Sequence, residues 1–273
     1  MSTLPHAVSD SATMLRRNLR HMLRYPSITV FIVGIPVALL LLFVYVFGST
    51  LGAGLGAVAG GRAAYVNFVT PGIILIAMAG AAQGTAISIA MDMTEGIIAR
   101  FRTMAISRAS VLTGHVVGGM IQTMLSTVVV LGVALLVGFW PTAGPVEWIG
   151  AIGLVAMTSL ALTWLSVALG LVSKSVETAS NLPMFLMILP FLGSGFVPTD
   201  SMPTAVRWFA EYQPFTPIMD TLRGLLMGTA IGDSGVAALA WCAGIALVGY
   251  IWARRLYDRD PTPRRLFARM GSS

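Results

Sequence analysis

Residues 28–48 read "ITVFIVGIPVALLLLFVYVFG", a run without a single charged side chain. A helix that crosses a bilayer needs about 20 consecutive apolar residues, and this run is long enough. Backbone amides within lipid must be hydrogen-bonded inside the protein, and the run lacks the apolar–polar alternation of a barrel strand. The stretch therefore predicts a membrane-spanning α-helix and places the chain among all-α integral membrane proteins.

The composition of the whole chain agrees with this class. Of its 273 residues, 56% are hydrophobic and only 10% are charged, whereas a soluble domain carries about 25% charged residues. So few charges cannot solvate the surface of a soluble protein of this size, which excludes that class. The polar and basic residues 1–27 lack the pattern of a cleavable signal peptide, so we expect the first apolar run to remain as a span.

Five further apolar runs follow the first. The six predicted spans are residues 28–48, 66–91, 111–140, 148–172, 182–198 and 236–253. The glycine- and alanine-rich connection of residues 48–65 is expected to be a flexible loop. No soluble block separates the runs, so we predict a single transmembrane domain over residues 1–273. It divides into a cytoplasmic amphipathic arm (1–27), a six-span bundle (28–253) and a basic cytoplasmic tail (254–273).

The positions of the basic residues predict the topology. All but three of the 17 Lys and Arg residues lie in residues 1–27, after the second span, after the fourth span, or in the tail. The three exceptions are Arg62, Arg207 and Arg223. Basic residues concentrate in cytoplasmic loops, so we expect a multi-pass protein of the cytoplasmic membrane with both termini in the cytoplasm. This pattern explains the basic pI of 10.1 without any nucleic-acid partner.

The arm contains "SATMLRRNLRHMLRYPS", residues 11–27, in which apolar and basic residues alternate with a helical period. Met14, Leu15, Leu19, Met22 and Leu23 share one side, and Arg16, Arg17, Arg20 and Arg24 lie on the other. Such a pattern is typical of an amphipathic helix that lies in the membrane interface. The alternative is an ordinary basic flank without a helix of its own.

A second amphipathic stretch, "MDMTEGIIARFRTMAISRAS", occupies residues 91–110 between the second and third spans. Asp92 or Thr94 is a suitable residue to cap the start of a helix. The apolar residues of this stretch then recur at helical spacing, at Ile97, Ile98, Phe101 and Met104. We predict a short cytoplasmic helix, the alternative being a solvated loop whose arginines only set the topology.

Motifs that would indicate an enzyme are missing from the sequence. It contains no G-x-x-x-x-G-K-[ST] loop, no H-E-x-x-H pair and no G-x-S-x-G elbow. The three histidines, His6, His21 and His115, show no metal-ligand spacing, and the single cysteine is Cys242. We therefore predict no catalytic residue, metal site or cofactor on this chain, and any energy for transport must enter through another subunit.

Residues 198–227 are too short and too rich in proline for another pair of spans. "TAVRWFAEY" and "IMDTLRGLLMG" predict two short helices around the breaker "QPFTP". Asp220 and Arg223 are spaced i, i+3, so they can form an ion pair on one helix face.

Two segments resemble the ABC-2 type permeases, which are the membrane subunits of ABC exporters. One is "MTEGIIARFRTMAISRASVLTGHVV", residues 93–117, and the other is "FLGSGFVPTDSMPTAVRWFAEYQPFTPIMDTLRGLLMG", residues 191–228. The matching positions of the second are Phe196, Pro198, Met202, Pro203, Pro214, Thr216, Asp220 and Arg223. Gln213 departs from the asparagine that is commonest in the family. The chain is most similar to daunorubicin-resistance permeases of actinobacteria, which implies drug export and antibiotic resistance.

The resemblance implies that the helix after the second span is a coupling helix that docks on a separate ATPase. Its contact residues would be Glu95, Gly96, Arg100, Phe101 and Arg102. A second ATPase contact would come from the amphipathic arm, through Arg16, Arg17 and Arg20. ATP and magnesium would bind the partner ATPase rather than this chain. The expected complex holds two ATPases and two permeases, the second permease being identical or related.

The resemblance also implies that the segment between spans five and six is a re-entrant hairpin that closes the outer exit. Its gate residues would be Pro198, Met202, Pro203, Pro214, Thr216, Asp220 and Arg223. The substrate path would run along spans one, two and five, past Met184, Phe185, Met187, Phe191 and Phe196.

Large, adaptable side chains along such a path suit a lipophilic substrate such as a drug, polyketide or glycolipid. One alternative is a permease for lipid-linked polysaccharide. Another is a membrane anchor that assembles partners without transport, in which case changes at Glu95 or Gly96 would leave transport intact.

Overall fold

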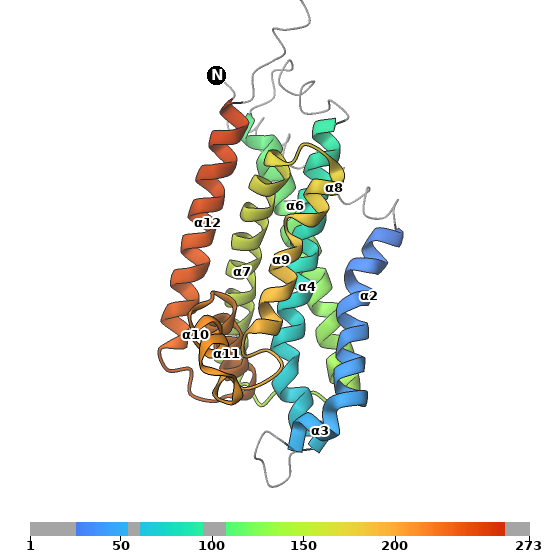
Figure 1. Ribbon diagram of the computed structural model, residues 1–273, viewed down its shortest axis with the longest axis vertical. Helices are drawn as coiled ribbons and strands as arrows, with labels where there is room; N and C mark the ends of the chain where they lie inside the picture. The colour runs from blue at the N-terminus through green and yellow to red at the C-terminus, as the bar shows by residue number, and fades with distance from the viewer. Residues whose placement is uncertain (1–25, 54–60, 95–107, 260–273) are drawn as a thin grey trace, which may run out of the picture.

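The computed structural model describes residues 26–53, 61–94 and 108–259, and these ranges are entirely helical apart from their connections (Figure 1). Five helices are long and apolar enough to cross a membrane, and residues Val176–Leu192 form a shorter apolar helix. The fold class predicted from the sequence, an all-helical membrane protein, is confirmed. The predicted amphipathic arm and the predicted coupling helix lie outside the described residues.

The first span consists of α2 (Pro26–Leu42), a π-helical turn (Phe43–Phe47) and α3 (Gly48–Ala53). The next three spans are α4 (Gly61–Thr94), α6 (Arg108–Val137) and α7 (Pro145–Val172). The shorter apolar helix comprises α8 (Val176–Asn181), α9 (Met184–Ile188) and the 3₁₀ turn η2 (Leu189–Leu192). After the 3₁₀ turn η3 (Thr199–Ser201) come α10 (Thr204–Tyr212), α11 (Phe215–Met227) and the last span, α12 (Ser234–Arg259).

Helix α4 is the centre of the bundle. Its most apolar window is 78% buried, whereas the corresponding windows of the first span and of α12 are each 22% buried. Its middle is rich in Gly, Ala and Ile and touches α2, α6, α7, α9 and α11. Small side chains let neighbouring helices approach closely in a membrane protein, so the composition of α4 suits its central position.

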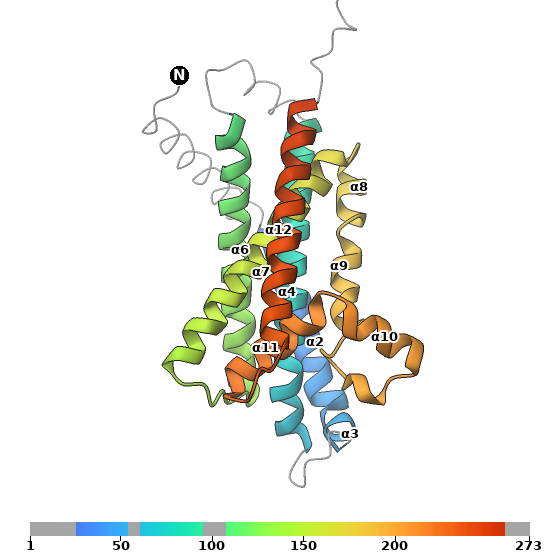
Figure 2. The ribbon, with the colours of Figure 1, turned by 90° about the vertical axis from the view of Figure 1, so that its left-hand side faces the viewer.

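Two ends of the bundle can be distinguished. The end that carries α10 and α11, called here the hairpin end, also holds α3 and the connection between α6 and α7 (Figure 1). At the opposite end, α4 stops at Thr94 and α6 begins at Arg108. Figure 2 shows that α10 stands out from the side of the bundle, while α11 lies against it.

Several predicted boundaries are wrong. The fifth segment was predicted at residues 182–198, but its helical part runs from Val176 to Leu192 and is interrupted near Pro183 and Pro190. Proline cannot donate a backbone hydrogen bond and distorts a helix. The predicted loop of residues 48–65 is helical on both sides, in α3 and in the first turn of α4.

The third span ends at Val137 rather than at residue 140, because Gly138 takes a φ of 110°, which favours glycine. Asp92 and Thr94 belong to the last turn of α4. The helix that either residue is predicted to cap lies outside the described residues, so the capping role stays a prediction. The Thr94 hydroxyl donates backwards to the carbonyl oxygen of Met91, at 2.9 Å.

Candidate functional site: a polar network between α11 and α4

The two short helices predicted around "QPFTP" are present as α10 and α11. Pro214 precedes α11 and Pro217 lies in its first turn, where a missing N–H costs no helical hydrogen bond. Gly228 ends the helix with a φ of 62°. Thr142, from the α6–α7 connection, donates its N–H to Leu226 and its hydroxyl to Met227, so the last carbonyls of α11 are satisfied.

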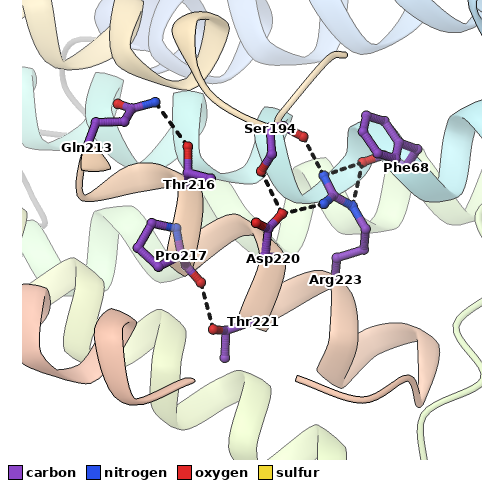
Figure 3. A network of polar contacts seen from close by, with 8 residues as sticks. All are labelled: Phe68, Ser194, Gln213, Thr216, Pro217, Asp220, Thr221 and Arg223. Atoms are coloured by element: carbon purple, nitrogen blue, oxygen red, sulfur yellow. Dashed lines mark hydrogen bonds and ion pairs between the residues drawn. The ribbon is translucent and has the colours of Figure 1, made fainter. Parts of the chain in front are cut away.

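One turn of α11 brings Asp220 and Arg223 together, as their spacing predicts. Nη1 of Arg223 donates to Oδ1 of Asp220 at 2.6 Å. The same carboxylate oxygen accepts a hydrogen bond from the hydroxyl of Ser194, and Nη2 of Arg223 donates to the Ser194 carbonyl, both at 2.6 Å (Figure 3). The ion pair thus holds the chain between η2 and η3 against α11.

Arg223 also reaches α4. Its Nε and Nη2 each lie 3.3 Å from the carbonyl oxygen of Phe68, and its guanidinium carbon lies 4.1 Å from the centre of the Phe68 ring (Figure 3). Arg223 therefore joins three separate segments of the hairpin end.

Glycines let these segments approach one another. A β-carbon on Gly72 of α4 would lie 2.9 Å from both the Cα and the carbonyl oxygen of Gly195. A β-carbon on Gly193 would collide with the Gln213 amide nitrogen and would lie 2.6 Å from the Thr216 hydroxyl oxygen. The stretch of residues 193–195 consequently passes between α4 and α11, and positions 193 and 195 have no room for a side chain larger than that of glycine.

Other predicted gate residues lie elsewhere in the same segment. Pro198 and Met202 flank η3, Pro203 precedes α10, and Thr216 is buried, where it receives a hydrogen bond from the Gln213 amide at 3.3 Å. The same amide nitrogen donates to the Leu189 carbonyl at 2.9 Å. Gln213 thus ties the start of α11 to η2.

Helix α10 has a different character. Arg207 pairs with Glu211 at 2.7 Å and with Asp200 at 2.9 Å, and these side chains are exposed. The hydrogen bond that Arg207 donates to Glu211, together with the charges of Glu211 and Asp200, raises the pKa of Arg207 above its ordinary value. Trp208 and Tyr212 are also exposed, with ring centres 5.3 Å apart. Exposed ion pairs contribute little to stability, so the Arg223 network, which is partly buried, is the stronger contact of the hairpin.

The predicted substrate-path residues divide into two groups. Met184 and Phe185 are exposed on α9, and Met187 is partly buried beside α4. Phe191 and Phe196 stack with ring centres 4.5 Å apart, and Phe43 of the π-helical turn lies 4.5 Å from Phe196. The structure therefore adds Phe43 to the predicted aromatic residues. A π-helical turn at such a contact is a frequent mark of a functional region.

The sequence pattern did not single out Phe68, Ser194 or Phe43. Glycines on both sides of Ser194 could have indicated a close contact, whereas nothing near Phe68 indicates an acceptor for arginine. The predicted ATPase contacts, Glu95, Gly96, Arg100, Phe101 and Arg102 with Arg16, Arg17 and Arg20, lie outside the described residues. Within the described ranges, no three His, Cys, Asp or Glu side chains are grouped to hold a metal ion.

Comparisons with known proteins agree with the helical membrane fold. Residues 11–227 match the family model described as ABC-2 type transporter. The chain is 28% identical over 253 residues to the daunorubicin resistance ABC transporter permease protein DrrB1 of Streptomyces coeruleorubidus, covering 92% of this chain and 87% of the relative.

Two further relatives match over shorter lengths. The probable doxorubicin resistance ABC transporter permease protein DrrC of Mycobacterium tuberculosis is 26% identical over 64% of each chain. The ABC transporter G family member 20 of Dictyostelium discoideum is 27% identical over 72% of this chain, which spans 27% of that protein. ABC permeases work with ABC ATPase subunits, and this sequence has no nucleotide-binding motif of its own. The chain is therefore a membrane permease subunit, not itself an enzyme, and belongs to the ABC-2 type transporter family.

Proposed function

We propose that the chain is the permease of an ATP-driven exporter that moves lipophilic or amphipathic compounds across the cytoplasmic membrane. The observation that carries this proposal is the match to the DrrB1 permease over 92% of the chain, together with the family match. A drug, a polyketide or a glycolipid would fit this class. The working complex would contain two ATPase subunits, this permease and a second permease, identical or related.

The proposed topology has six spans, the shorter helix Val176–Leu192 acting as the fifth. Both termini and residues 95–107 would face the cytoplasm, and the hairpin end would face outward. The distribution of Lys and Arg supports this orientation. The ATPase would then contact Glu95, Gly96, Arg100, Phe101 and Arg102, with a second contact at Arg16, Arg17 and Arg20.

The hairpin of α10 and α11 would act as the outer gate. Asp220 and Arg223 tie α11 to Phe68 on α4 and to Ser194, so the hairpin and the central helix are joined through one side chain. A movement that separates α11 from α4 must break this network. A movement that keeps the network intact must carry α11, α4 and Ser194 together. The gate would therefore have discrete positions rather than a continuous range.

The substrate path would follow the face between the first span and α9. Phe191 and Phe196 contact Phe43 there, and Met184 and Phe185 are exposed on α9. Large apolar side chains of this kind accept varied lipophilic molecules. A permease for lipid-linked polysaccharide would need rows of aromatic side chains that stack on sugars. Among the described residues, the aromatic contacts on this face join phenylalanine rings to one another, at Phe43, Phe47, Phe191 and Phe196. This arrangement favours a lipophilic substrate over a sugar chain.

The substrate class can be tested with the purified complex in proteoliposomes. We expect planar lipophilic compounds such as doxorubicin to raise its rate of ATP hydrolysis, because bound substrate favours the productive conformation. A hydrophilic oligosaccharide of similar mass is the control and should leave the rate unchanged. Stimulation by the oligosaccharide alone would replace the proposed substrate class with the polysaccharide alternative.

A further inference from the structure

A buried pair of polar side chains joins α4 to α6 at the end of the bundle opposite the hairpin. Nε2 of His115 lies 3.1 Å from Oδ2 of Asp92, and the two side chains expose only 6% and 10% of their surface. Asp92 lies in the last turn of α4 and His115 lies early in α6. The pair therefore connects the two helices that flank residues 95–107.

Buried apolar residues lie close to this pair in the sequence of both helices. Ile89 of α4 and Leu112 and Val116 of α6 form a buried cluster with residues of two further helices. Those residues are Val167 and Ala168 of α7 and Ala253 and Tyr257 of α12. A buried carboxylate is stabilised by hydrogen-bond donors, so the contact with His115 contributes to holding Asp92 in this position.

Close backbone packing extends the contact between α4 and α6. A β-carbon on Gly119 would lie 2.5 Å from the Thr85 hydroxyl oxygen, and one on Gly84 would lie 3.4 Å from the Gln122 amide nitrogen. The pairs Asp92 with His115, Thr85 with Gly119 and Gly84 with Gln122 succeed one another along the antiparallel helices, in the direction of the hairpin end. The two helices are thus held by a polar contact at one end and by small residues further in.

We infer that Asp92 and His115 make α4 and α6 a single rigid body and thereby position residues 95–107 for the ATPase. This inference rests on the proposed function, in which those residues receive the movement of the ATPase. A pair of helices locked together transmits a displacement as a unit, whereas independent helices would absorb part of it. Asp92 and His115 are positioning residues in this account, since the ATPase contact itself would be made by other side chains.

The rigid body can be measured directly in the complex purified with its ATPase. Thr94 and Thr113 are exposed, one on each helix, so each can be changed to cysteine and spin-labelled while the native Cys242 is buried. Electron paramagnetic resonance then gives the distribution of distances between the labels. We expect a narrow distribution that is the same without nucleotide and with ATP and vanadate trapped on the ATPase.

The pair is removed by Asp92→Asn and by His115→Gln, and it is rebuilt in reverse by Asp92→His combined with His115→Asp. Each single change should broaden the distance distribution and lower the permease-dependent ATP hydrolysis by roughly 2- to 30-fold, the usual range for residues that carry coupling. The double change should restore both properties in part. Recovery in the double variant separates positioning from a simple loss of folding.

Glu95→Ala is the comparison that distinguishes this inference from the proposed function. It should lower the stimulated ATP hydrolysis while leaving the α4–α6 distance narrow. If the Glu95 variant behaves like wild type while the pair variants broaden the distance, the ATPase contact is wrong but the rigid body stands. If the distance changes on nucleotide trapping, or stays narrow in both single variants, the inference is overturned.

Discussion

Replacing Arg223 by alanine should lower the free energy of unfolding by about 3 kcal/mol, the lower end of the range for breaking a buried ion pair. The lower end applies because the Asp220 side chain is 35% exposed, so water can partly solvate its carboxylate once the guanidinium is gone. The loss also leaves the carbonyl oxygens of Ser194 and Phe68 without this donor. Thermal unfolding of the detergent-purified complex should show a midpoint several degrees below that of wild type.

Two other variants give this experiment its controls. Arg207→Ala removes an arginine with two carboxylate partners from the same hairpin, but the groups are exposed, so the midpoint should hardly change. Arg223→Lys keeps the charge but not the planar fork that reaches three acceptors, so its effect should be intermediate. Equal midpoints for Arg223→Ala and Arg207→Ala would show that the network does not hold the hairpin.

A single methyl group at Gly72 should be the second strongly disruptive change. Its β-carbon would lie 2.9 Å from two backbone atoms of Gly195, which cannot rotate away as a side chain can. Overpacking of this kind typically costs about 1–3 kcal/mol. Gly72→Ala should therefore lower the unfolding midpoint and the export rate together, since residues 193–195 must shift and take Ser194 away from Arg223.

Gly132 of α6 and Gly153 of α7 are matched controls for this change. A β-carbon at either position would meet no heavy atom within 4 Å. Alanine favours a helix over glycine by up to about 1 kcal/mol, so Gly132→Ala and Gly153→Ala should unfold at the wild-type midpoint or slightly above it. If Gly72→Ala matched these two controls, the close approach of α4 to residues 193–195 would be contradicted.

The sequence predicts most helices of this fold because each long span depends on a property that is local. An uncharged run such as residues 28–48 must be helical in lipid wherever it packs. The prolines around α11 and the i, i+3 spacing of Asp220 and Arg223 are likewise local, and both the helix and the ion pair are present. The predicted bounds of the fifth segment are wrong because the apolar character of a run does not mark its helix ends. The helix starts at Val176, before the apolar run, and is interrupted near Pro183 and Pro190.

Contacts between distant segments are what the sequence pattern could not provide. Phe68 binds Arg223 through a backbone carbonyl, and no side-chain pattern marks a carbonyl as an acceptor. Asp92 resembled a helix cap because capping depends only on residue type. Its contact with His115 arises only once α4 and α6 pack against each other. The predicted coupling and arm residues stay predictions.

The central claim is that this permease draws its energy from a separate ATPase, and co-purification tests it most directly. The tagged chain would be extracted from its native membrane in mild detergent, and every co-purifying protein identified by mass spectrometry. We predict a soluble subunit with a G-x-x-x-x-G-K-[ST] loop, in a ratio of one copy per permease. Recovery of the chain alone, or only with proteins that lack this loop, would contradict the claim.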